Sequence, residues 1–234
     1  MRPSPERHYQ GESGRQYHIA KRFVPNVAVP WVCQLRAEKI QKHVHATDVV
    51  LEFGVGFGWN LASLKCAKKI GIDVAEDLEE HARAFGIEFQ TQMRSLGDAT
   101  ADVIVCHHAL EHVLHPGAVL AELGRLLRPG GQLLLFVPFE KERRYRRFDP
   151  LEPNHHLYSW NAQTIGNLLR EAGYTLQSLR LAKFRFDRFA AVWAARLGLG
   201  ERGFRLIRAL GLILFPEYEI RAVAQKPNDF ALAS

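Results

Sequence analysis

The sequence has few cysteines and methionines and no long apolar run. Its 234 residues include three cysteines, Cys33, Cys66 and Cys106, without C-x-x-C spacing. This pattern fits neither a disulfide framework nor a zinc knuckle, so we expect free thiols in a reducing compartment. No stretch of about 18 apolar residues could span a membrane, and the N-terminus lacks the apolar core of a signal peptide. We therefore expect a cytoplasmic protein.

The positive charge of the chain is modest and unevenly distributed. Lys and Arg number 31 and Asp and Glu 25, which gives a net charge of +6, and 47% of the residues are hydrophobic. Such a composition is typical of a globular protein and excludes a disordered or low-complexity chain. Residues 1–50 and 131–234 carry net charges of +4 and +6, whereas residues 51–130 carry −4. We expect the basic flanks to meet something anionic.

Short apolar segments alternate with amphipathic ones over the first 137 residues. We expect strands at 48–53, 69–73, 87–91, 101–106 and 132–137, and helices at 30–43, 61–67, 76–85 and 117–128. The last helix should end at Arg128-Pro129-Gly130-Gly131, where Pro cannot continue a helix and Gly can make the turn. This alternation predicts an α/β fold, a parallel sheet with helices on both faces.

The pattern changes after Pro138. A long basic connection leads to an expected helix at 160–172 and a strand at 174–186. Residues 188–215 are predicted to be helical with a break at the Gly198/Gly200 pair, and 218–225 alternate like a final strand. We therefore divide the chain into an N-terminal arm and helix (1–45), a main domain (46–187 and 218–226) and a helical insertion (188–217).

Three glycines at alternate positions, Gly54, Gly56 and Gly58, follow the first expected strand. Glycine lets the backbone turn tightly, so a ligand can lie against the main chain. A dinucleotide-binding loop would need G-x-G-x-x-G, but Trp59 stands where the last glycine would be. Glu52 precedes the loop, and its carboxylate suits a ligand with a positive amine better than a pyrophosphate. A tight turn without a ligand is the alternative.

A second acid, Asp73, ends the next expected strand, about 20 residues after the glycine loop. In an open α/β sheet this position lies at the carboxyl edge, where a carboxylate can accept hydrogen bonds from ribose hydroxyls. The alternative is that Asp73 caps the helix that follows it. The ribose interpretation indicates a nucleoside-containing cofactor without naming it.

These residues resemble the class I S-adenosylmethionine-dependent methyltransferases, in particular the small-molecule type 11/23 group. The resemblance covers about residues 48–182 and rests on four blocks in the same order as in the family: 50–58, 71–73, 101–113 and 126–133. It implies S-adenosylmethionine as cofactor and a Rossmann-like, seven-stranded, mostly parallel sheet whose last strand is antiparallel. The alternating residues 218–225 could supply that strand.

The resemblance assigns cofactor contacts to particular positions. Glu52 and the loop from Gly54 to Gly58 should surround the methionine part, and Asp73 the ribose. The family usually has an acid near the end of the third strand, where this chain has Gln90-Thr91-Gln92-Met93, so we assign the adenine contact to Gln92, whose amide can donate and accept. We add His107, at the end of the fourth strand, to the cofactor site.

Methyl transfer to a hydroxyl requires alignment of the reactants and removal of a proton. Histidine is the natural base at neutral pH, so we name His108, beside the expected site, and His155, in the later connection, as catalytic candidates. Packing or capping is the alternative role for each, as positioning is for Glu111 and His112. No metal site is expected, because no Cys or carboxylate completes a known set around the histidines.

Two basic segments bear on the partner. The run Lys141-Glu142-Arg143-Arg144-Tyr145-Arg146-Arg147 could hold phosphate or carboxylate groups of a small anionic acceptor, or form a solvated surface. Residues 201–215 have an apolar and a basic face and could lie on an anionic membrane; the alternative is a packing or homodimer helix. If residues 201–215 lie on an anionic membrane, the protein would have a membrane-peripheral location.

The expected function is transfer of a methyl group from S-adenosylmethionine to a small molecule, with a hydroxyl of a sugar, glycolipid or natural-product intermediate favoured. A non-catalytic cofactor-binding scaffold and an RNA methyltransferase are the alternatives. No Asn-Pro-Pro-Tyr-like block follows the fourth strand, so the chain does not resemble the amino-directed DNA methyltransferases or their RNA relatives. Nucleic acid is therefore an unlikely partner.

Overall fold

The computed structural model describes Gly11, Gly14 and residues 23–140, 147–149, 152 and 154–228. Its strands form one seven-stranded sheet in the order β3-β2-β1-β4-β5-β7-β6. The strands are β1 (Val49–Phe53), β2 (Lys68–Ile72), β3 (Glu88–Gln90), β4 (Ala101–His107), β5 (Leu127–Pro138), β6 (Thr175–Phe184) and β7 (Glu217–Gln225).

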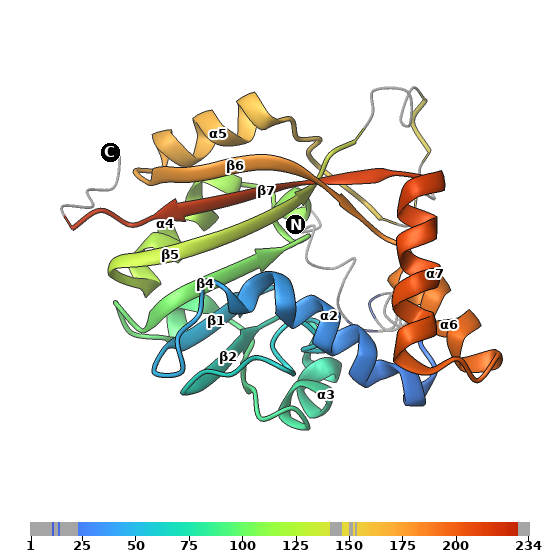
Figure 1. Cartoon of the computed structure of the whole chain (residues 1–234). Helices are drawn as coiled ribbons and strands as arrows, with labels where there is room; N and C mark the ends of the chain where they lie inside the picture. The colour runs from blue at the N-terminus through green and yellow to red at the C-terminus, as the bar shows by residue number, and fades with distance from the viewer. Residues whose placement is uncertain are drawn as a thin grey trace.

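The helices lie around this sheet (Figure 1). They are α2 (Val29–Gln41), α3 (Glu79–Arg83), α4 (Pro116–Leu126), α5 (Ala162–Glu171), α6 (Asp187–Arg196) and α7 (Gly200–Leu214). Short 3-10 turns are η2 (Asn26–Ala28), η3 (Glu76–Leu78), η4 (Met93–Ser95) and η5 (Leu110–His112). None of the described helices is both long and apolar enough to cross a bilayer.

Strand direction confirms the predicted fold class. The ladders from β3 to β5 are parallel, whereas β7 is antiparallel to both of its neighbours, β5 and β6. Parallel strands that helices cover on both faces appear in a sequence as continuous apolar runs. Strand β4 is such a case, because it is buried at four consecutive positions from Val103 to Cys106. This is why the apolar runs of the sequence located the central strands.

Two apolar layers cover the two faces of the sheet. On one face, strand residues such as Ile104 and Leu135 pack with α4 and α5 through Leu123 and Ile165. The other layer joins the opposite strand face to α2 through Ile40 and to the segment around α3. A third cluster fixes α6 and α7 against η2, α2 and the end of the glycine loop; its fully buried members include Ala28, Val32, Ala191, Ala194 and Phe204.

Two local predictions are wrong. Residues 61–67, expected as a helix, consist of turns and bends, in which isolated bonds such as Ala62 N–H to Gly58 C=O are not continued into a helix. The stretch Arg128–Gly131, expected as a turn after the helix, belongs to β5. There the Gly130 N–H donates to the Lys226 carbonyl and the Lys226 N–H donates to the Gly131 carbonyl. The chain after β7 thus joins this stretch to the sheet, although Gly130 itself keeps a turn-like φ of 76°.

The helices α6 and α7 form an excursion between two paired strands. Phe184, the last residue of β6, lies opposite Glu217, the first residue of β7. Gly198 and Gly200 make the connection between the helices with φ of 65° and 62°, as the predicted break required. Figure 1 shows the two helices beyond the carboxyl ends of β1 and β4.

Candidate active site

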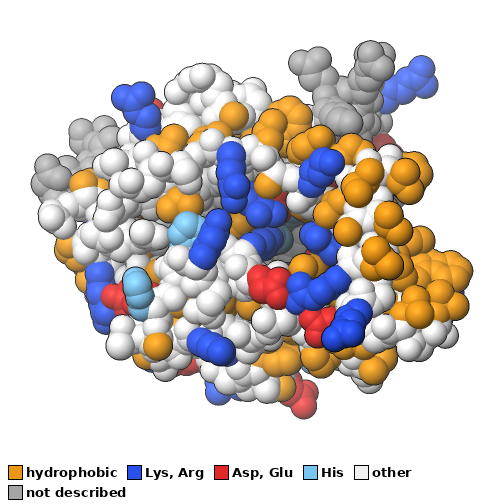
Figure 2. Space-filling view, in the orientation of Figure 1, with side chains coloured by type: hydrophobic (Ala, Val, Ile, Leu, Met, Phe, Trp, Pro, Cys, Tyr) orange, Lys and Arg blue, Asp and Glu red, His pale blue; other side chains and the backbone are white. Residues whose placement is uncertain are grey.

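One large cavity lies at the carboxyl edge of the parallel strands. Its volume is about 1810 Å³, which exceeds the ~300–1,000 Å³ of an ordinary ligand pocket and leaves room for two ligands. Residues that follow β1, β2 and β3 line it, together with residues at and after the end of β4 and residues of α2, α6, β6 and β7. The space-filling view shows a hollow at the centre of this face with Lys and Arg side chains around it (Figure 2).

Backbone hydrogen bonds fix the glycine loop at the edge of this cavity. The N–H groups of Gly54 and Val55 donate to the carbonyl of Ile72, and the N–H of Asp73 donates to the carbonyl of Gln90. The ends of three strands are thereby tied together. Gly54, Gly56, Asp73 and Gln92 all line the cavity, so the sequence placed these four candidates correctly at one edge.

The glycines of the loop have different local environments. All three adopt positive φ, 74° at Gly54, 53° at Gly56 and 77° at Gly58, but the space around them differs. A Cβ on Gly54 would lie 2.6 Å from Ala109 Cβ, whereas one on Gly56 would meet nothing within 4 Å. Gly58 is not among the cavity residues, and its Cβ would lie 2.6 Å from Ile87 Cδ1. Gly58 therefore lets the loop pack closely against the segment around α3. At Gly56 the backbone is open, so a ligand can lie against it.

Asp73 makes the capping contact that was the alternative role and also bonds the glycine loop. Its Oδ2 accepts from the Gly56 N–H at 2.8 Å and its Oδ1 from the Ala75 N–H at 3.1 Å. The carboxylate thus holds the glycine loop and caps the following turn. Each carboxylate oxygen has a second acceptor site, so these bonds leave capacity for ribose hydroxyls.

Glu52 lies behind the loop and not on the cavity wall. The amide of Asn60, which does line the cavity, donates to Glu52 Oε1 at 2.5 Å. Burial raises the pKa of Glu52 to about 8. Glu52 Oε2 and Asn60 Oδ1 are buried without a hydrogen-bond partner among the described residues. Two orphaned acceptors beside a glycine turn suit a ligand that brings a positively charged amine.

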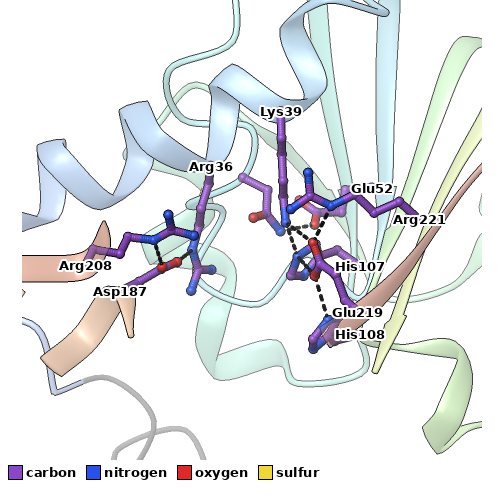
Figure 3. A network of polar contacts seen from close by, with 10 residues as sticks. Arg36, Lys39, Glu52, His107, His108, Asp187, Arg208, Glu219 and Arg221 are labelled. Carbon is purple, nitrogen blue, oxygen red and sulfur yellow. Dashed lines mark hydrogen bonds and ion pairs between the residues drawn. The ribbon is translucent and has the colours of Figure 1, made fainter. Parts of the chain in front are cut away.

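A buried charge network that the sequence did not predict forms the opposite wall (Figure 3). Glu219 of β7 accepts from His108 Nε2 at 3.1 Å and from Arg221 Nε at 2.8 Å, and Lys39 Nζ of α2 lies 3.6 Å from its Oε1. Burial opposes ionisation of Glu219, but the positive charge of Lys39 and the hydrogen bond from His108 hold its pKa well below the usual range. Glu219 is therefore an ionised carboxylate that orients the groups around it.

His107 and His108 stack on each other at this wall, with ring centroids 4.5 Å apart. Lys39 Nζ lies 2.5 Å from His107 Nε2. Burial, followed by the positive charge of Lys39, holds the pKa of His107 well below 6.5, so its ring is neutral. Burial also lowers the pKa of Lys39 to about 8. Both predicted histidines line the cavity.

The second predicted base, His155, lies elsewhere. His155 is exposed, its N–H donates to Glu152 at 2.8 Å, and it is not among the cavity residues. Its neighbour His156 lines the cavity instead and bonds Glu140 Oε1 through Nδ1 at 2.7 Å. An adjacent pair of histidines in a loop gives no sequence signal for which one turns inward.

Two groups of the described residues place three potential metal-ligating side chains within 4.8 Å of one another: His107, His108 and Glu219, and Glu111, His112 and His156. In the first group Lys39 already brings a positive charge to Glu219. The prediction that the protein binds no metal stays untested.

The basic run 141–147 lies outside the described residues, except for Arg147.

A family profile described as a methyltransferase domain matches residues 26–179. The chain belongs to this methyltransferase family. A probable S-adenosylmethionine-dependent methyltransferase of Mycolicibacterium smegmatis is 30% identical over 129 residues, 53% of this chain and 50% of its own length. A ubiquinone biosynthesis O-methyltransferase of Methylococcus capsulatus is 36% identical over 110 residues, 42% of this chain and 46% of its own length. The chain thus spans about half the length of these relatives.

Solved methyltransferase structures share the fold. The 1,6-didemethyltoxoflavin-N1-methyltransferase of Burkholderia thailandensis, solved with its substrate and S-adenosylhomocysteine, superposes with a TM-score of 0.56 at 18% identity, over 94% of this chain and 84% of that chain. The methyltransferase resemblance, the Rossmann-like fold and S-adenosylmethionine as the cofactor are thereby confirmed. The glycine turn, the open Gly56 backbone and the orphaned acceptors of Glu52 and Asn60 fit this cofactor.

Proposed function

We propose that this methyltransferase-family chain transfers a methyl group from S-adenosylmethionine to a hydroxyl of a small anionic acceptor, such as a sugar, glycolipid or natural-product intermediate. The observation that carries the proposal is one cavity with two unlike halves. The glycine loop, Asp73 and Asn60 line one half, and a basic and aromatic wall lines the other. The similarity to an O-methyltransferase supports oxygen as the acceptor atom.

When bound, S-adenosylmethionine supplies an activated methyl group on its sulfonium sulfur. In the proposed arrangement Asn60, held by Glu52 behind it, binds the amino group of the donor, the backbone at Gly54–Gly56 lies along its methionine part, and Asp73 holds the ribose. Gln92 is exposed at the same edge and is assigned the adenine contact. These groups orient the donor and contribute no proton.

His108 is the proposed base. The ionised Glu219 accepts a hydrogen bond from its Nε2, which fixes the tautomer in which Nδ1 carries the free lone pair. Nδ1 then accepts the proton that the acceptor hydroxyl releases as its oxygen receives the methyl group. Arg36, Lys39 and Arg221 line the same wall and would bind an anionic group of the acceptor.

Calorimetry with S-adenosylhomocysteine tests the donor half of the proposal. The wild type should bind it, and Asp73→Ala should bind at least about tenfold more weakly because it loses the ribose contact and loosens the loop. Asp48→Ala is the matched control, since that carboxylate caps a turn at the far end of β1. Absence of binding by folded wild type would refute the proposal.

Mass spectrometry tests the acceptor half. Extracts of a deletion strain should contain a species lighter by one methylene than its wild-type counterpart, and purified protein with S-adenosylmethionine should convert it. Fragmentation locates the new methyl group. A methyl group on nitrogen or carbon would replace the O-methyl proposal while leaving the donor assignment intact.

A further inference from the structure

The helices α6 and α7 expose an unusual amount of apolar surface. Leu206, Ile213 and Phe215 are each more than 60% exposed, and Phe189, Trp193 and Leu210 are exposed as well. We call these six residues the hairpin face. Hydrophobic side chains gather over α6 and α7 beside the hollow in Figure 2. A continuous apolar surface of this kind on a globular protein marks an interaction site.

Helical spacing arranges the hairpin face in two stripes. Residues three, four or seven positions apart share one side of a helix. On α6 the stripe runs through Phe189, Trp193 and Arg196, and on α7 through Arg202, Leu206, Leu210 and Ile213. Ring contacts from Phe215 to Phe186, from Phe186 to Phe189 and from Phe189 to Trp193 connect the α6 stripe to Phe215, the residue that follows α7.

The charge of this segment is positive where it is exposed. Residues 185–217 contain six arginines and only three acids, Asp187, Glu201 and Glu217. Each acid already pairs with an arginine of the segment: Arg208, Arg205 and Arg185, respectively. Arg196 and Arg202 stand exposed on the two apolar stripes. Apolar side chains beside exposed arginines suit an anionic bilayer surface.

The hairpin face also continues into the cavity. Phe189 and Phe215 of the face, together with Phe186 between them, line the cavity, and so do Arg188 and Arg196. A surface that lies on a bilayer would therefore place the mouth of the cavity against the lipid. An acceptor anchored in the membrane could reach the site without crossing water.

We propose that the hairpin face docks on an anionic lipid bilayer and that the acceptor enters the cavity from it. The second part rests on the proposed methyl-transfer function, whereas docking rests on this surface alone. A second copy of the chain is a poorer occupant. A two-fold interface brings the same patch together from both subunits, so this basic patch would face a second basic patch, while the three acids of the segment are already paired.

Vesicle flotation tests the docking. The full chain is mixed with phosphatidylcholine vesicles with and without about 30 mol% phosphatidylglycerol. It should float with the anionic vesicles, and about 0.5 M salt should weaken this binding. Leu206→Glu should reduce the bound fraction at least about tenfold, because it places a charge in the apolar stripe. Arg196→Gln/Arg202→Gln should lower binding to the anionic vesicles only.

The control is Leu181→Glu, an exposed leucine on β6 outside the hairpin face, which should float like the wild type. Calorimetry with S-adenosylhomocysteine on each variant shows that it is folded and keeps the two proposals separate, since Leu206 does not line the cavity. If the wild type binds S-adenosylhomocysteine but no vesicle, the docking proposal is overturned and the methyl-transfer proposal is not. Docking is also overturned if light scattering shows a dimer that Leu206→Glu converts to monomer, or if Leu206→Glu floats normally.

Discussion

Glu52 shows how much a single buried carboxyl can control at this site. Its Oε1 is held by Asn60, its Oε2 has no partner among the described residues, and burial raises its pKa to about 8. At neutral pH the side chain is therefore mainly protonated. An ammonium group of the donor would favour the carboxylate form, so donor binding should release a proton.

This coupling gives a pH dependence of known sign. Because the pKa of Glu52 is about 8, raising the pH from about 6 progressively removes its proton before the donor arrives, so donor affinity should rise through pH 8 and level off only above that pKa. Calorimetry at pH 7 in two buffers of different ionisation enthalpy should show release of about one proton. Glu52→Gln should abolish the release and weaken binding, whereas Glu88→Gln, exposed and paired with Lys68, should change neither.

His108 carries the prediction for the chemical step. His108→Gln should lower kcat by about 10²–10⁴, the usual contribution of a general base, with little change in donor affinity. His155→Gln is the direct comparison, because that histidine is exposed and lies outside the cavity lining. A larger loss of kcat in His155→Gln than in His108→Gln would show that the loop brings His155 to the acceptor.

At the scale of elements, the glycine loop and the block after β4 depend on each other. Gly54 adopts φ of 74°, and a Cβ there would lie 2.6 Å from Ala109 Cβ. Gly54→Ala should cost about 2–4 kcal/mol of unfolding free energy, from the left-handed backbone and the overpacked contact together.

Chemical denaturation measures this cost. Gly97→Ala is the control, since a Cβ there meets nothing within 4 Å and its backbone is not left-handed. Its change should stay within about 0.5 kcal/mol. Equal stability of Gly54→Ala and wild type would mean that the glycine loop shifts freely and does not keep a fixed conformation.

The elements that the sequence predicted are those whose environment is uniform along the segment. The apolar run of β4 is buried on both faces, so its composition alone located it. Residues 61–67 resemble a helix in sequence because Leu61 and Leu64 are buried as in a helix, although turns hold them. The place of Arg128–Gly131 in the sheet could not be predicted locally, because Lys226, almost 100 residues later, pairs with the glycines.

The same distinction separates the two walls of the cavity. The donor wall comes from short motifs around Gly56 and Asp73, each of which can be read locally. The opposite wall joins Lys39 to Glu219 across 180 positions of the chain, and no local pattern marks either residue as a partner. The only sequence trace is Glu219 itself, an acid at the start of an otherwise alternating strand.

At the scale of the molecule, the position of α6 and α7 depends on one apolar side chain. Phe204 is the only buried residue of α7, and it packs with Trp31 of α2 at a ring-centroid distance of 6.2 Å. Phe204→Ala should destabilise the fold by about 3–5 kcal/mol where unfolding is cooperative.

Hydrogen exchange distinguishes a global from a local loss. If α6 and α7 detach on their own, their amides should exchange faster in Phe204→Ala while those of β4 stay protected. Leu210→Ala, at a half-exposed position of the same helix, is the control and should alter neither stability nor exchange. Unchanged protection of α7 in Phe204→Ala would contradict the inferred anchoring.

The pairing of Phe184 with Glu217 has a consequence for how such a chain can diversify. The two ends of the α6–α7 excursion lie side by side, so the pairing of β6 with β7 does not depend on the length or sequence of the segment between them. Closing a longer or shorter connection between adjacent points changes the entropy of the chain only slowly with length. The α6–α7 side of the cavity can therefore change in length at little entropic cost while the glycine loop and Asp73 stay on the parallel strands, provided that its buried contacts with α2 are kept.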